Sequence, residues 1–164
     1  MHKKQLFETY IMQNIDSAYR FAYTYAKNRE DAEDIVNESV LKAIKSINYL
    51  QKSEHIKPWF YRIIVNTAFT YLKRRSKITY LDYEKSFAET DGTEDDYSEL
   101  TLNSMIEKLE PKYKSIIVLR FLEDMSLKEI GQILDINENT VKTRLYRALK
   151  LLKIDMEGEV HEKI

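Results

Sequence analysis

Residues 126–152 have the sequence SLKEIGQILDINENTVKTRLYRALKLL, whose pattern predicts two helices joined by a tight turn. Ser126 can cap the first helix, and Glu129 stands three residues later, where the partner in a capping box belongs. Gly131 lies inside that helix, where glycine costs roughly 1 kcal/mol relative to alanine, so we expect another helix to pass close to its backbone. Asp and Asn, which favour turns and caps, interrupt the pattern at Leu134–Asn137.

The second helix of this pair is expected to begin at about Glu138. Its apolar positions follow helical spacing and predict one buried face, formed by Val141, Leu145, Ala148, Leu149 and Leu152. The segment from Glu138 to Lys153 holds five basic residues and one acid. A short helix, a turn and a basic second helix form the helix-turn-helix layout, which reads base edges and binds phosphates in the DNA major groove. An ordinary helical hairpin with a solvated charged face is the alternative at this point.

The charges of the chain are unevenly distributed. The 164 residues include 26 basic and 27 acidic groups, but residues 1–78 hold 14 basic and 8 acidic ones. Residues 79–100 hold 1 basic and 8 acidic groups, and residues 101–164 hold 11 of each. With only 3 Gly and 2 Pro, the composition predicts an all-α protein. We expect two small helical domains, at 1–78 and 101–155, joined by an acidic flexible linker at 79–100 and followed by a frayed tail at 156–164.

Several classes of function find no support in the sequence. Without Cys the chain can form neither disulfides nor thiolate metal sites. The three His are scattered, and the three Gly are isolated, so no phosphate-binding loop is present. We therefore expect no enzyme activity, cofactor, metal or small-molecule substrate. No apolar run approaches the ~20 residues that span a bilayer, and the N-terminus lacks a secretory signal, so we expect a cytoplasmic protein.

Apolar periodicity predicts three further helices in the N-terminal half, at Leu6–Lys27, from about Glu30, and at Trp59–Lys77. The segment Asn48–Lys57 has no helical period and is expected to be a loop, with Pro58 at the first position of the next helix. Charged side chains of the second helix should stay outside the core, as a solvated face or as a docking face for a large partner: Asp31, Asp34, Glu38 and Lys42.

One face of the Trp59–Lys77 helix combines an aromatic ring, an amide and cations. Trp59, Arg62, Asn66 and Lys73 share this face, and the helix ends in a basic run. Melted nucleic acid is bound by such mixtures, because bases stack on rings while phosphates pair with cations. A core Trp beside a run that neutralises the helix dipole would explain the pattern equally well.

Three segments together resemble the extracytoplasmic-function (ECF) group of bacterial RNA polymerase sigma factors, over roughly residues 5–154. AYTYAKNREDAEDIVNESVLKAI (22–44) resembles the family's helix pair that binds core polymerase. KPWFYRIIVNTAFTYLKRRSK (57–77) resembles its helix for opening the minus-10 promoter element, and LEPKYKSIIVLRFLEDMSLKEIGQILDINENTVKTRLYRALKLL (109–152) resembles its minus-35 reader. Their order and spacing are far more specific than any one motif.

The resemblance implies partners and site residues. The polymerase-binding residues would be Asp31, Asp34, Glu38 and Lys42. Minus-10 recognition and melting would fall to Tyr49, Lys52, Lys57, Trp59, Arg62, Asn66, Lys73, Arg74 and Arg75. Duplex minus-35 DNA would be bound by Glu138, Asn139, Lys142, Thr143, Arg144 and Arg147.

The resemblance also implies how the protein is controlled. Many relatives carry Asp where this chain has Thr70, which weakens any role assigned to that helical turn. The chain is too short for an appended sensor domain, so control would come from a separate anti-sigma factor, in this family usually membrane-anchored, in an envelope or extracellular stress response. A stand-alone helix-turn-helix regulator or adaptor that acts without polymerase is the alternative from another class.

Overall fold

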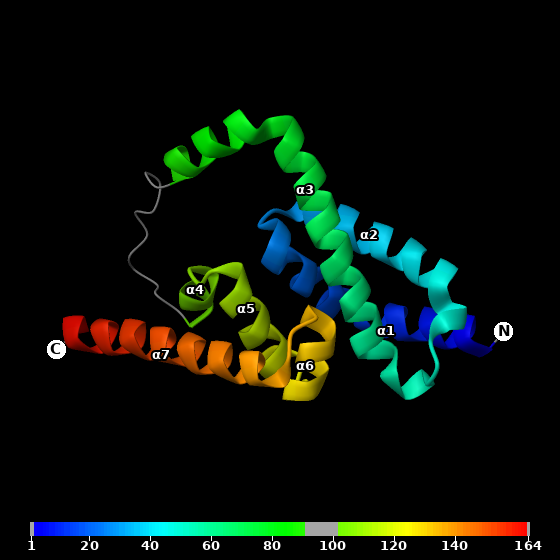
Figure 1. Cartoon of the computed structure of the whole chain (residues 1–164). Coiled ribbons are helices and arrows are strands. Elements are labelled where there is room, and N and C mark those ends of the chain that lie inside the picture. The colour runs from blue at the N-terminus through cyan, green and yellow to red at the C-terminus, as the bar shows by residue number, and fades with distance from the viewer. Residues whose placement is uncertain (1, 91–101, 164) are drawn as a thin grey trace.

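The computed structural model describes the backbone of residues 2–90 and 102–163 and, within them, the side chains of residues 2–76 and 104–153. All elements in these ranges are helical and none is a strand, which confirms the predicted all-α class. In chain order they are α1 (His2–Ala26), α2 (Arg29–Ser46), the 3-10 helices η1 (Ile47–Tyr49) and η2 (Ser53–His55), α3 (Ile56–Thr90), α4 (Leu102–Glu107), α5 (Pro111–Ile117), the π-helix η4 (Val118–Leu122), α6 (Leu127–Leu134) and α7 (Glu138–Lys163) (Figure 1).

Local side-chain bonds set the shape of the first two helices. Asn14 has non-helical dihedral angles inside α1, and its Nδ2 donates to the carbonyl oxygen of Tyr10 at 2.8 Å, a bond that competes with the helical ladder. Asn28 caps α2, because its Oδ1 accepts from the backbone nitrogen of Asp31 at 2.9 Å. The chain therefore reverses tightly, and α1 packs along α2.

Helix α3 is longer than predicted at both ends. It begins at Ile56, so Pro58 lies within the first turn, where its missing N–H costs little, rather than at the first position. The expected loop before it contains η1 and η2. The helix continues to Thr90, so the first part of the expected linker at 79–100 is helical, while residues 91–101 lie outside the described residues.

The C-terminal half also departs from the predicted boundaries. Helix α7 continues to Lys163, so the expected frayed tail at 156–164 is helical through that residue. Leu149, predicted to be buried, is 41% exposed, because it lies beside the stripe that α7 packs against the domain, which consists of Val141, Leu145, Ala148 and Leu152. The sequence also predicts a helix at Lys112–Leu122 with Phe121 in the core, but Phe121 is 57% exposed, since the π-helix alters the phase of the helix around it.

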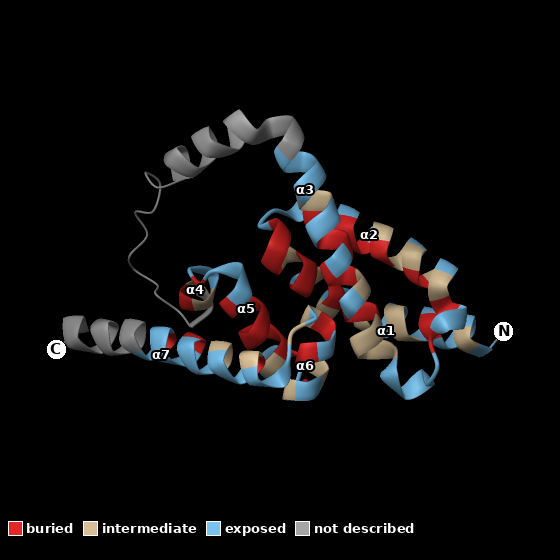
Figure 2. Cartoon of the chain, viewed as in Figure 1, coloured by how far each residue is buried: buried red, intermediate tan, exposed pale blue. Residues whose placement is uncertain are grey.

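One hydrophobic core cluster spans the two halves, and a second lies within the C-terminal half. Helix α3 packs against α1 and α2 on one side and against α6 on another, and buried residues line these contacts (Figure 2). The apolar spacing of Trp59–Lys77 predicts a single core face that runs from Phe60 to Leu72 and omits Tyr61 and Val65. Because α3 is covered on more than one side, these two residues are 0% and 2% exposed. Tyr61 stacks on Phe21 of α1 with ring centroids 4.9 Å apart. The described halves are thus in direct contact rather than only tethered.

Candidate nucleic-acid interface

The turn between α6 and α7 is built as the sequence predicts. Ser126 Oγ accepts from the backbone nitrogen of Glu129 at 3.1 Å, and Glu129 Oε1 accepts from that of Ser126 at 3.0 Å, a complete capping box. Asp135 ends α6 with a left-handed φ of 57°. Asn137 Oδ1 then accepts from the backbone nitrogen of Thr140 at 2.8 Å and caps the start of α7. This turn fixes the angle at which α7 leaves the domain.

Gly131 makes the predicted close approach, but mainly to the turn rather than to another helix. A Cβ at this position would lie 2.8 Å from the carbonyl oxygen of Ile136, closer than a carbon and an oxygen can pack. The side chain of Val141 in α7 is the next neighbour, at 3.7 Å. The glycine therefore allows the tight turn that the helix-turn-helix unit requires.

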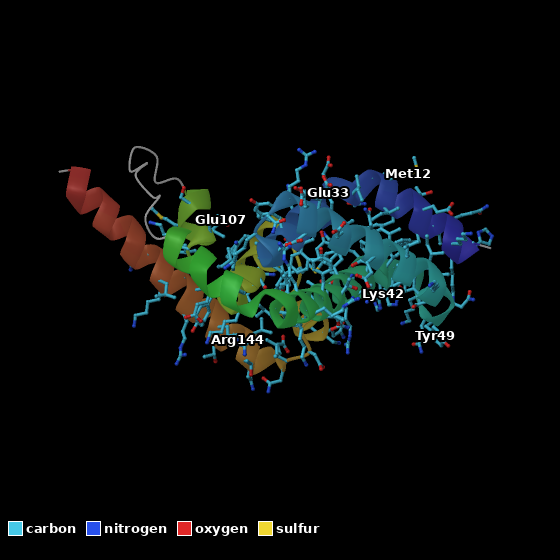
Figure 3. All side chains as sticks on the ribbon, turned by 90° about the horizontal axis from the view of Figure 1, so that it is seen from above. Met12, Glu33, Lys42, Tyr49, Glu107 and Arg144 are labelled. Atoms are coloured by element: carbon cyan, nitrogen blue, oxygen red, sulfur yellow. The ribbon has the colours of Figure 1, made fainter. Side chains whose placement is uncertain are left out.

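One open pocket lies at the start of α7. Its lining comes from α5, the turn and the first turns of α7: Lys112, Tyr113, Asn137, Asn139, Thr140, Thr143, Arg144 and Arg147. Four of the six residues predicted to bind minus-35 DNA are among them, and Glu138 and Lys142 are exposed beside it. Figure 3 shows Arg144 directed away from the body of the molecule.

Lys112 was missed at the sequence level. Its Nζ lies 5.1 Å from the centre of the Tyr113 ring and 3.7 Å from Glu110, and its side chain belongs to α5 rather than to the helix-turn-helix pair. Lysine after a helix-opening proline is a common surface pattern, so only the tertiary fold places Lys112 next to Arg144 and Arg147. The pocket thus joins three cations to the N-terminus of a helix, where anions are favoured.

Another open pocket lies where η1, η2 and the start of α3 meet. It is lined by Tyr49, Leu50, Gln51, Lys52, His55, Pro58, Trp59, Arg62 and Gln132. Tyr49 is 82% exposed and projects from its end of the molecule in Figure 3. Four of the nine predicted minus-10 residues line this pocket, two of them aromatic and two basic. Gln132 comes from α6, so the C-terminal half forms part of its wall.

The other predicted minus-10 residues lie elsewhere. The Nζ of Lys57 donates to the carbonyl oxygen of Glu123 at 2.7 Å, so this lysine faces the C-terminal half. Asn66 and Lys73 are exposed further along α3. Thr70, the position where relatives often have Asp, is also exposed, and its Oγ1 donates back to the carbonyl oxygen of Asn66 at 2.9 Å.

Arg74 and Arg75 pair with acids that were predicted to bind polymerase. Arg74 lies 3.2 Å from Glu38, and Arg75 forms an ion pair with Asp31. Tyr71 donates to Asp31 at 3.0 Å or to Asp34 at 2.9 Å. Burial, together with the hydrogen bond to Asp34, raises the pKa of the Tyr71 hydroxyl.

The expectation that Asp31 lies outside the core is wrong. Its side chain is 7% exposed and also accepts from Asn28 at 2.7 Å, because the α1–α2 turn folds over it. Asp34 is exposed, and Lys42 is half-exposed beside Glu38 at 3.8 Å. Of the predicted polymerase-binding acids, Asp31 is thus buried and paired with Arg75, whereas Asp34 is exposed.

The described part of the chain offers neither a metal-binding cluster nor a membrane-spanning helix. Residues 2–76 and 104–153 contain no group of three or more His, Asp or Glu arranged to hold a metal ion. Within the same part of the chain no helix is both long and apolar enough to cross a membrane.

Comparisons with known proteins agree on one family. The model for sigma-70 region 2 matches residues 10–78, and the model for sigma-70 region 4 matches residues 99–152. The chain is 45% identical to RNA polymerase sigma factor SigV of Bacillus subtilis, over 97% of this chain and 98% of that protein. It is 33% identical to the ECF RNA polymerase sigma factor SigW of the same organism, over 84% of this chain and 82% of SigW.

Two solved structures share the fold. The sigma factor RpoE of Bartonella quintana, in complex with the anti-sigma factor NepR, superposes with a TM-score of 0.72 at 18% identity, over 92% of this chain and 96% of RpoE. CnrH, in complex with the cytosolic domain of CnrY, gives a TM-score of 0.65 at 19% identity, over 93% of this chain and 88% of CnrH.

Proposed function

This chain belongs to the extracytoplasmic-function group of sigma-70 RNA polymerase sigma factors, and we propose that two of its open pockets hold the two elements of a promoter. A sigma factor directs core RNA polymerase to promoters and is not itself an enzyme. One observation carries the assignment of sites: each pocket gathers residues predicted for one promoter element and none predicted for the other. We assign the α7 pocket to duplex minus-35 DNA and the η1–η2 pocket to melted minus-10 DNA.

The residue types of the α7 pocket suit duplex DNA. Asn139, near the start of α7, can reach base edges in the major groove, where an amide pairs well with adenine. Lys112, Arg144 and Arg147 surround it and suit phosphates, which position the protein without reading sequence. Glu138 and Lys142 flank the pocket and complete the proposed minus-35 surface.

The η1–η2 pocket suits an unpaired base. Flipping a base out of the duplex costs a few kcal/mol, and stacking on an aromatic ring returns about 1–3 kcal/mol per base. Tyr49 and Trp59 offer two rings, and Lys52 and Arg62 offer cations for the flanking phosphates. Asn66, Lys73, Arg74 and Arg75 would follow the strand along α3, once the two arginines exchange their carboxylate partners for phosphates.

The accessible charges of α2 suit a large protein partner. We assign contacts with core polymerase to Asp34, Glu38 and Lys42, and we give Asp31 the role of orienting Arg75 and Tyr71. Because polymerase would hold both domains at a fixed spacing, two weak promoter contacts would act as one selective contact.

We infer that a separate partner protein controls this chain. The similar sigma factor RpoE is bound to the anti-sigma factor NepR, which supports an anti-sigma factor for this chain. We propose that the partner is membrane-anchored, that the chain acts in the cytoplasm, and that its release answers envelope or extracellular stress.

Co-purification with bacterial core RNA polymerase tests the function, and permanganate footprinting on a pool of genomic promoters tests the sites. We expect stable association and melted thymines just upstream of transcription starts. Tyr49→Ala should abolish the melting signal while retaining association, with Glu8→Gln on α1 as an exposed control. Duplex binding by the protein alone, without polymerase association, would instead identify a stand-alone regulator.

A further inference from the structure

Glu123 has an unusual position for a carboxylate. It follows the π-helix η4, its backbone nitrogen donates to the carbonyl oxygen of Val118 at 3.0 Å, and Asp124 after it has a left-handed φ of 53°. This turn carries the side chain out of the C-terminal half and into the contact with the N-terminal half. Its side chain is only 3% exposed. A buried carboxylate is costly unless opposite charges and hydrogen bonds compensate it.

Those compensating groups all come from the other half of the chain. Arg20 of α1 lies 3.5 Å from one carboxylate oxygen, and Lys57 of α3 lies 3.6 Å from the other. Lys57 also donates to the backbone carbonyl of Glu123 at 2.7 Å. We call Arg20, Lys57 and Glu123 the interdomain cluster.

Two tyrosines of the N-terminal half face the same carboxylate. Burial, with the negative charge of Glu123 second, raises the pKa of Tyr10 and also that of Tyr61. Within the described residues the buried Tyr10 hydroxyl has no hydrogen-bond partner. The N-terminal half therefore surrounds Glu123 with two cations and two neutral phenols.

The cluster holds α6 over the proposed minus-10 pocket. Arg62, in the wall of that pocket, donates to the backbone carbonyl of Gln132 at 3.1 Å, and Gln132 forms another part of the wall. Lys57, a predicted minus-10 residue, is occupied by Glu123. In this arrangement a DNA strand that used both cations would have to displace the C-terminal half.

We propose that Glu123 fastens the free chain in a closed, self-blocked state, in which the C-terminal half borders the minus-10 pocket, occupies Arg62 and Lys57, and must separate before both cations can bind DNA. Only the consequence for DNA binding rests on the proposed function of the pocket. The closure itself concerns how the two halves pack, and it can be measured without DNA or polymerase.

The single Trp of the chain makes the closure measurable. Trp59 lines the pocket beside Gln132, so acrylamide should quench its fluorescence more strongly once α6 moves away. We expect Glu123→Gln, which keeps the shape and removes the charge, to raise the ratio of open to closed molecules roughly tenfold, as expected for a hydrogen bond to a charged group. Glu8→Gln removes an exposed acid of α1 and should leave the quenching unchanged.

A second readout follows the distance between the halves. Because the chain has no Cys, fluorophores can be placed on Met12→Cys and Tyr146→Cys, two positions that are 80% and 76% exposed. Energy transfer should fall in Glu123→Gln relative to the labelled parent chain. Arg20→Gln perturbs the cluster from its exposed side, so it should open the chain without unfolding it. In the double variant Arg20→Gln/Glu123→Gln, the fall in energy transfer should be smaller than the sum of the falls in the two single variants.

The outcomes separate the two proposals. Unchanged quenching and energy transfer in both variants, with native helix content by circular dichroism, would overturn the closed state and leave promoter recognition untouched. If Glu123→Gln opens the chain but substitutions in the pocket do not affect promoter melting, the proposal of a closed state stands. The assignment of the pocket to minus-10 DNA would then be overturned. A Glu123→Gln chain that fails to fold leaves the decision to Arg20→Gln.

Discussion

The guanidinium of Arg62 donates a 3.1 Å hydrogen bond to the main-chain carbonyl of Gln132, which lies 70 residues further along the chain. Since the acceptor is a backbone atom, no substitution of Gln132 removes it, whereas a movement of α6 does. The wall of the pocket that we assign to minus-10 DNA therefore depends on the packing of the two halves.

The minus-35 assignment predicts that phosphate contacts and base contacts behave differently. Arg147→Ala and Lys112→Ala should each weaken promoter binding by the holoenzyme at all sequences and reduce the salt slope by about 1. Asn139→Ala should instead alter sequence preference, by about 1–3 kcal/mol at one base pair. Binding at several salt concentrations to a library of minus-35 variants measures both. Lys108→Ala, an exposed cation outside the pocket, is the control.

Substitutions of Asp31 and Asp34 should have different effects, one on the stability of the fold and the other on polymerase binding. Asp31→Asn weakens the buried end of the Arg75 pair, and because Arg75 is half-exposed we expect a loss of only about 1 kcal/mol in the free energy of unfolding. Asp34→Asn should leave stability nearly unchanged and reduce polymerase affinity. Urea denaturation and a pull-down with core polymerase distinguish them. A polymerase defect confined to Asp31→Asn would contradict the assignment.

Gly131→Ala should destabilise the C-terminal half. Alanine normally stabilises a helix relative to glycine by about 1 kcal/mol, but here its Cβ would meet the backbone oxygen of Ile136 at 2.8 Å. Because a main-chain atom cannot turn aside, we expect a net loss of about 1–3 kcal/mol. Thermal unfolding followed by circular dichroism measures the effect, with Lys128→Ala in the same helix as the control. A stabilised Gly131→Ala protein would show that the turn can shift.

Because the Tyr25 hydroxyl is buried, we expect the protein to lose stability in alkali. Burial raises its pKa from 10.0 to about 12, and its Oη is hydrogen-bonded to Ser115 Oγ of the other half at 2.6 Å. The unfolded chain therefore loses this proton first, so the stabilisation is complete below pH 10 and disappears as the pH rises towards 12. Denaturation midpoints measured across that window should fall less steeply in Tyr25→Phe. Equal slopes in both proteins would contradict the buried hydroxyl.

Local signals were the most predictive part of the sequence. Ser126 with Glu129, the Asp–Asn turn and the stripe of α7 each reflect bonds within a few residues, and the structure confirms them, apart from Leu149. The sequence also identified pocket residues that lie close together in one helix, such as Asn139 and Arg147 of α7.

Contacts between distant segments could not be predicted in this way. Lys112 reaches the α7 pocket, and Gln132 the other pocket, only because the helices pack as they do. Tyr61 was missed because periodicity assumes one buried face, while α3 is covered on more than one side. Asp31 had the pattern of a surface acid, and only the α1–α2 turn shows why it is buried.

The π-helix at Val118–Leu122 fixes the direction of Glu123. Its wider turn bonds the backbone nitrogen of residue 123 to the fifth residue before it, so this stretch holds one residue more than an α-helix of the same path would. Each residue of an α-helix advances the side-chain direction by about 100°. Deleting a single residue here would therefore rotate the carboxylate away from Arg20 and Lys57 while leaving the composition of the interface almost unchanged.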